Sequence, residues 1–204
     1  MNMKQILLTT LLVLVALMGQ AQEIGPAQAT AEDYINLLNK QGYYVYALDL
    51  SKLEKDKYLM SPVIQVYSNA QLEQDLMEDF RISYTNSAPI ITVGLMPQTD
   101  SLFTCNFQFD KVCGLKMNLP KPSVKNEVDG SEEISFLARP FIIHPDWKEN
   151  EVIPIVAYSS SWYDPDIRAC RNCDVNEFDK DYRTSATFQN SPKIYVFGIK
   201  IRKI

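Results

Sequence analysis

The sequence predicts an α+β fold that is mainly antiparallel β-sheet, sandwich-like, with two short N-terminal helices. Two apolar patterns with helical spacing come early, over residues 30–40 and 70–80, and most other apolar runs have the character of strands. Helices followed by many short strands are typical of α+β domains built around an antiparallel sheet. Nine Phe, eleven Tyr and two Trp residues, with only seven Gly, indicate an ordered body rather than a disordered chain.

The first 21 residues have the order of a secretory signal peptide. Lys4 gives a positive start, residues 6–18 are apolar except for two Thr, and residues 19–21 offer small side chains for cleavage. The apolar run is short for a bilayer span, which takes about 20 residues, and no Cys follows to carry a lipid. We therefore expect residues 22–204 to be a single exported domain, periplasmic or secreted, with no membrane span.

The two helices are expected from their caps and their apolar spacing. Thr30 and Asp33 resemble a capping pair before the first, and Gly42 stands where a C-terminal cap belongs. Asn69 can cap the second, over residues 70–80. The apolar stripe of this second helix consists of Leu72, Leu76, Met77 and Phe80. It also bears four acids, Glu73, Asp75, Glu78 and Asp79, which we interpret as a solvated face rather than a catalytic pair.

Strands are expected where aromatic and β-branched runs are bounded by Pro, Asp, Asn and Ser. They cover residues 43–50, 62–68, 89–96, 102–109, 112–119, 133–143, 151–159 and 193–203. In the last run, Lys200, Arg202 and Lys203 are interspersed with apolar residues. Basic side chains discourage edge-to-edge pairing of sheets, so we interpret this run as an edge strand.

Cys105 and Cys113 belong to two runs that alternate apolar and polar residues, and that alternation predicts how the runs pair. A three-residue turn keeps both apolar faces together, whereas a two-residue turn mixes them. The predicted partners are Phe109 with Cys113, Phe107 with Leu115, Cys105 with Met117 and Phe103 with Leu119. In this register the two cysteines lie four strand positions apart, roughly 13 Å, which is too far for a disulfide or a shared zinc ion.

The four cysteines are expected to be structural disulfide residues, because the chain is exported. Cys170 and Cys173 have CxxC spacing, but no strand-then-helix context of a redox motif surrounds them. Two arrangements stay open: a local Cys170–Cys173 bridge, or cross-links from this loop to Cys105 and Cys113. We favour at least one cross-link, which would close a long loop.

The stretch of residues 159–166 is the leading candidate for a ligand site. Trp162 and Tyr163 could stack on a sugar ring, while Asp164 and Asp166 could accept hydrogen bonds from its hydroxyls. The alternative is that the two rings anchor a loop to the core and that Asp-Pro ends a strand.

Two further groups of residues are candidates for a functional site. His144 is the only histidine, in Ile-Ile-His-Pro-Asp-Trp, and no GxSxG motif accompanies it, so we interpret it as a loop residue. Several side chains after Cys173 carry oxygen atoms that could coordinate a calcium ion. Their spacing is not that of an EF-hand, and the Gly of the EF-hand loop is absent. They are Asp174, Asn176, Asp179 and Asp181.

The leader and the general composition resemble small secreted or periplasmic proteins of Bacteroides-type bacteria, many of which belong to families of unknown function. The resemblance implies export and carries over no functional residue. The formal net charge of −5, without a Lys/Arg cluster, argues against a nucleic-acid partner. We expect a non-enzymatic domain without a cofactor that binds a small molecule, a glycan or a protein. The alternatives are a hydrolase of polysaccharide or peptide, with its site around residues 144–147 and 159–181, and a structural envelope protein.

Overall fold

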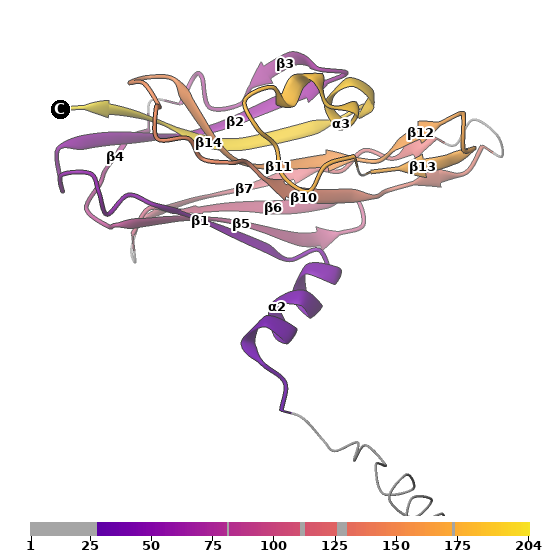
Figure 1. Cartoon of the computed structure of the whole chain (residues 1–204), viewed down its shortest axis with the longest axis horizontal. Coiled ribbons are helices and arrows are strands. Elements are labelled where there is room, and N and C mark those ends of the chain that lie inside the picture. The colour runs from indigo at the N-terminus through magenta and orange to yellow at the C-terminus, as the bar shows by residue number, and fades with distance from the viewer. Residues whose placement is uncertain (1–27, 81, 111–112, 126–129, 173) are drawn as a thin grey trace, which may run out of the picture. The chain divides into compact units, whose positions relative to one another are not determined.

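The computed structural model describes residues 28–204 except 81, 111–112, 126–129 and 173 (Figure 1). The first described element is helix α2 (Ala31–Lys40). Its start is the expected capping pair: Asp33 accepts a hydrogen bond from the Thr30 backbone N–H at 2.7 Å, and its own N–H donates to the Thr30 hydroxyl at 3.3 Å. Its end is the expected glycine cap, with Gly42 at φ 82°.

Four strands make the first antiparallel sheet, in the order β1-β5-β6-β7. Each was expected from its apolar run, with ends that differ by a few residues. Their bounds are β1 (Tyr44–Asp49), β5 (Ile90–Thr99), β6 (Leu102–Gln108) and β7 (Gly114–Pro120). The β6–β7 hairpin has the predicted register, pairing Phe103 with Leu119, Cys105 with Met117 and Phe107 with Leu115.

Six strands make the second antiparallel sheet, in the order β10-β11-β14-β2-β3, with β4 also on β2. Their bounds are β2 (Tyr58–Ser68), β3 (Gln71–Asp75), β4 (Tyr84–Thr85), β10 (Phe136–Pro140), β11 (Val152–Ser160) and β14 (Ile194–Lys203). Two small hairpins stand outside both sheets. They join β8 (Val124–Lys125) to β9 (Glu132–Glu133) and β12 (Trp162–Asp164) to β13 (Ala169–Arg171).

The main core lies between the two sheets, which form two layers in Figure 1. Phe103 of β6 is fully buried and contacts rings of the other sheet edge to face, at centroid distances of 4.7 Å to Tyr158 and 5.3 Å to Tyr195. Such pairs add about 0.5–1.5 kcal/mol to the burial of the rings. The predicted sheet-rich, sandwich-like body is therefore found in residues 36–204.

A second core covers the opposite face of the six-stranded sheet at one end. The 3₁₀ helix η1 (Tyr182–Thr184) and helix α3 (Ala186–Asn190) place Tyr182 and Phe188 there, with rings 4.8 Å apart. Ile194 and Val196 of β14 belong to this second core, while Phe197 and Ile199 belong to the main core. Because both faces are covered, β14 is buried almost continuously instead of alternating.

Two expectations about the fold are wrong. Residues 70–80 begin with strand β3 and not with a helix, so the second of the two expected helices is not formed. Asn69 and Ala70 both have positive φ, 46° and 63°, and form the two-residue turn of a β2–β3 hairpin. The last strand β14 is not an edge strand, because it pairs with β11 on one side and β2 on the other.

Among the residues that the structure describes, no helix has both the length and the apolar character needed to cross a membrane.

Candidate functional site

The residues of the predicted ligand site lie in and beside the β12–β13 hairpin. Trp162 is 5% exposed and so is not the open stacking platform that the sequence suggested. Asp164 accepts a hydrogen bond from Arg171 at 2.7 Å and another from the Asp166 backbone N–H at 3.0 Å. None of these residues, nor Tyr163, lines any of the three hollows described below. Ligand binding at this hairpin stays a prediction.

The expected disulfides are not found among the cysteines that the structure describes, Cys105, Cys113 and Cys170. Cys105 is buried on the core face of β6, and burial raises the pKa of its thiol well above the usual value. Cys113 lies opposite Phe109 where β6 connects to β7, as the register predicts, and its carbonyl accepts a hydrogen bond from the Phe109 backbone N–H at 3.0 Å, but its side chain is exposed instead of facing the core. The cross-link from this hairpin to Cys170 is therefore wrong for the described pairs, and Cys173 lies outside the described residues.

The acidic residues of segments 70–80 and 174–181, considered above as a solvated helix face and as calcium ligands, contact other groups of the protein. Glu73 lies on β3 and pairs with Lys193 at 2.6 Å, and Asp75 accepts a hydrogen bond from the Met77 backbone N–H at 3.0 Å. Asp174 accepts hydrogen bonds from the backbone N–H and hydroxyl of Thr187. Within the described part of the chain, no three His, Cys, Asp or Glu side chains converge as a metal site requires. The calcium hypothesis therefore gains no support.

A different group of residues forms a concave site where β10 leaves its sheet. After β10, the chain runs through residues 141–151 before it returns as β11, and a second segment, residues 178–182, lies beside it. Backbone hydrogen bonds hold the two segments together, from Ile142 to Phe178 at 2.8 Å and from Phe178 to Pro140 at 2.9 Å. They enclose a hollow of about 360 Å³, called here the loop hollow, which falls within the usual size of ligand pockets.

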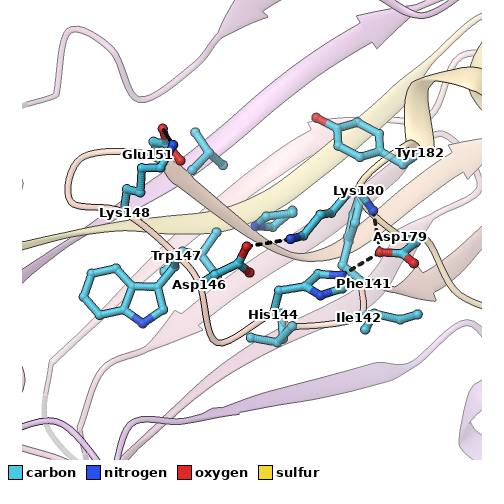
Figure 2. Close-up of a pocket in the computed structure, with 14 residues that line it drawn as sticks. Phe141, Ile142, His144, Asp146, Trp147, Lys148, Glu151, Asp179, Lys180 and Tyr182 are labelled. Atoms are coloured by element: carbon cyan, nitrogen blue, oxygen red, sulfur yellow. Dashed lines mark hydrogen bonds and ion pairs between the residues drawn. The ribbon is translucent and has the colours of Figure 1, made fainter.

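Two polar pairs join the segments across the loop hollow (Figure 2). Nε2 of His144 lies 2.6 Å from Oδ1 of Asp179, and Nζ of Lys180 lies 2.7 Å from Oδ2 of Asp146. The Lys180 backbone N–H also donates to Asp179 at 2.6 Å. The ammonium of Lys180 holds the pKa of Asp146 below its usual value, and the Lys180 N–H and then His144 do the same for Asp179. Both carboxylates are therefore ionised at neutral pH.

The wall of the loop hollow is apolar and aromatic. Phe141 and Tyr182 are in edge-to-face contact at 5.1 Å and connect the hollow to the second core. Trp147 is half-buried, and its ring lies edge to face with that of Tyr58 at a centroid distance of 6.4 Å. The hollow thus sets fixed charged groups beside apolar and aromatic side chains.

A second hollow lies on the other side of residues 143–147. Leu48, Leu50 and Leu53 line it from the β1 side, and Ile153 and Ile201 line it from the other sheet. Its volume is about 420 Å³, and we call it the side hollow. Asp49 and Lys52 also line the side hollow, and His144 and Trp147 line both hollows, so they form part of the partition between them.

The loop hollow contains a His–carboxylate pair and a Lys–carboxylate pair. The His144–Asp179 pair resembles two members of a hydrolytic triad, but none of the described residues that line the hollow is a Ser, Thr or Cys nucleophile. A glycosidase needs a carboxylic acid whose pKa is raised so that it can donate a proton. Asp146 and Asp179 have lowered pKa values instead, which suits groups that accept hydrogen bonds from a ligand.

Sequence reasoning found part of this site and missed the rest. From the sequence, His144 is interpreted as a loop residue and Asp179 as a calcium candidate, while the hydrolase alternative places its site around residues 144–147 and 159–181, which include both. Their contact joins positions 35 residues apart, which no local motif signals. Trp147 follows closely after His144, and its two-sided position could not be predicted without the packing of residues 141–151 between the hollows.

The comparisons with known proteins identify a family and nothing further. No curated protein and no solved structure matches the chain significantly. A family described as a domain of unknown function, DUF5041, matches residues 78–203, which is more than half of the chain. The match includes every residue that lines the loop hollow and leaves out β1, β2 and β3. The chain belongs to the DUF5041 family.

Proposed function

We propose that this chain is an exported, non-enzymatic domain that binds a glycan in the loop hollow. The observation that carries the proposal is the fixed row of polar groups, Asp146, Lys180, Asp179 and His144, beside an apolar and aromatic wall. Sugars present hydroxyl groups around an apolar ring face. They are therefore bound by ionised carboxylates and amines together with aromatic side chains.

The positions of the polar groups support binding by a preformed site. Each of the four side chains has a partner on the facing segment, which reduces the rotamer freedom that is lost when a ligand binds, and the two carboxylates are more than half exposed and so open to a ligand. Asp146 and Asp179 each keep lone pairs for ligand hydroxyls, since every carboxylate offers about four acceptor positions. Export rests on the leader pattern of residues 1–21, which places such a domain where extracellular glycans occur.

The test is calorimetric titration of the purified chain against a panel of neutral and acidic oligosaccharides. For the glycan that binds, we expect Trp147→Ala to weaken affinity at least about tenfold, because an aromatic platform is lost. Asp179→Asn should weaken it by a similar factor, because an acceptor loses its charge and His144 loses its partner. Circular dichroism melting of each variant separates a binding effect from unfolding.

Tyr163→Ala is the matched control, because it removes an aromatic ring from the other candidate site. If Tyr163→Ala abolishes binding and Trp147→Ala does not, the ligand binds at the β12–β13 hairpin and the proposal is wrong. Failure of every oligosaccharide to bind would also overturn it. Release of shorter sugars during incubation, lost in His144→Gln, would favour the hydrolase alternative instead.

A further inference from the structure

The basic residues of β14 need a new explanation, because the strand lies in the middle of its sheet. Ile199 and Ile201 point into the main core, so Lys200 and Arg202 point to the opposite, outer face. Neither Lys200 nor Arg202 forms an ion pair with any residue that the structure describes. Lys200 lies between Val152 of β11 and Ser61 of β2 and so does not protect a sheet edge, whereas Arg202 lies beyond the last pair with β11 and pairs with β2 alone.

Both cations line a third hollow, of about 430 Å³, which we call the outer-face hollow. Ser61 of β2 is the direct partner of Lys200 in the sheet, and its hydroxyl lies 2.8 Å from that of Ser83. Pro62, Val63 and Phe80 supply apolar surface. Asp75 and Glu78 also line the hollow, yet neither is paired with Lys200 or Arg202.

The loop hollow and the outer-face hollow are neighbours on one face of the sheet. Val152 lines the loop hollow and is the direct partner of Lys200, which lines the outer-face hollow. Paired residues of adjacent strands lie about 5 Å apart. The turn of residues 148–151 stands between the hollows, with Lys148 and Glu151 on one side and Asn150 on the other.

We propose that the outer-face hollow is a second subsite that binds the carboxylate of an acidic sugar, so that the glycan is a uronic-acid polymer. The proposal rests on the proposed function, because it extends the same ligand from the loop hollow across the strand pair. Lys200 and Arg202 receive the carboxylate, and Ser61, Ser83 and Asn150 hydrogen-bond ring hydroxyls. Asp75 and Glu78 accept hydrogen bonds from further hydroxyls.

The mixed charge of this hollow is what selects an acidic sugar over other anions. A bare phosphate or a phospholipid head group would meet the two carboxylates without offering them enough donors. A uronic acid offers one anionic group to the cations and several hydroxyl donors to the carboxylates. Because the whole chain is acidic, with a formal net charge of −5, attraction of the polymer depends on these local cations.

The test uses a hexamer of galacturonic acid and its fully methyl-esterified form, titrated into the full chain at low and high salt. We expect the acid form to bind at least about tenfold more tightly than the ester at low salt, with the difference falling at high salt. The double variant Lys200→Gln/Arg202→Gln should lose that preference. Lys116→Gln/Lys125→Gln, which removes two exposed lysines of β7 and β8, is the control of equal charge and should keep it.

The outcomes separate this inference from the proposed function. If Trp147→Ala abolishes binding of both forms and the Lys200/Arg202 variant changes neither, the loop hollow binds glycans and the second subsite is wrong. If the Lys200/Arg202 variant removes the acid preference while Trp147→Ala has no effect, the second subsite holds and the proposed function fails. Binding to phosphatidylglycerol vesicles or inorganic phosphate but not to the hexamer would overturn the acidic-sugar proposal.

Discussion

Replacing Gly198 with alanine should destabilise the six-stranded sheet. At Gly198, strand β14 lies too close to its neighbour β11 for any side chain. A Cβ at Gly198 would lie 2.4 Å from the Ile153 carbonyl oxygen, 3.1 Å from its carbonyl carbon and 3.0 Å from Cα of Pro154. An ordinary carbon–oxygen contact is about 3.3–3.6 Å, so the backbones must separate by about 1 Å. All three obstacles are backbone atoms, which cannot rotate away as a side chain would.

The cost follows from that required displacement. Forcing extra volume into a packed core costs about 1–3 kcal/mol, and the affected pair includes Ile153 and Ile199 of the main core. Alanine recovers about 0.4–1 kcal/mol by restricting the unfolded chain. Because backbone has to move, we expect the upper part of the range, a net loss of about 2 kcal/mol in the free energy of unfolding. For a chain of this size that lowers Tm by roughly 4–8 °C.

Gly94→Ala is the matched control, since Gly94 is also on an interior strand but has room for a methyl group. Its nearest neighbours would be the Asn106 carbonyl oxygen at 3.8 Å and the Asn106 Cβ at 4.0 Å, both ordinary contacts. Stability should stay the same or rise by up to about 1 kcal/mol. Urea unfolding followed by circular dichroism measures both variants. Equal unfolding midpoints for Gly198→Ala and Gly94→Ala would refute the reasoning.

Two further predictions concern titration and thiol reactivity. The Lys180 backbone N–H and His144 hold the pKa of Asp179 below its usual value of 3.8. The ionised carboxylate therefore stabilises the fold at pH values above 3.8, and this stabilisation is lost as the pH falls through the lowered pKa. Asp179→Asn should therefore lose less stability than the wild type when urea unfolding is compared at pH 5 and pH 2, and equal losses would contradict this. Under native conditions a thiol reagent should label the exposed Cys113 quickly and the buried Cys105 only after urea is added, as peptide mapping would show.

The β6–β7 hairpin was predictable because its information is local. Strict alternation from Phe103 to Phe109 and from Cys113 to Leu119 leaves one register that keeps both apolar faces on the core side, and the structure has that register. Helix α2 was predictable for the same reason, since the two residues of its cap, Thr30 and Asp33, are only three positions apart. Patterns whose period and turn agree within one segment need no tertiary information.

The segment after Asn69 was not predictable. Its apolar residues have the spacing of a helix, but its backbone forms a strand that pairs with β2. Asn69 is favourable both as a helix cap and in the left-handed conformation of a tight turn. Pairing with β2 decides between them, since Gln71 to Asp75 gains a ladder of backbone hydrogen bonds to the β2 strand of the six-stranded sheet. A sequence segment alone does not contain that neighbour.

By itself, the sequence determined the antiparallel strands, the β6–β7 register, the cap of the first helix and the separation of Cys105 from Cys113. Tertiary structure decided that β14 lies between β11 and β2, which places Lys200 in the interior of the sheet and puts Lys200 and Arg202 together at a pocket on its outer face. It also brought His144 and Asp179 together. The physical reason is the same in both cases. Strand order, and contacts between side chains 35 or more residues apart, depend on which faces of the sheets bury apolar area against each other. That burial is a property of the whole chain.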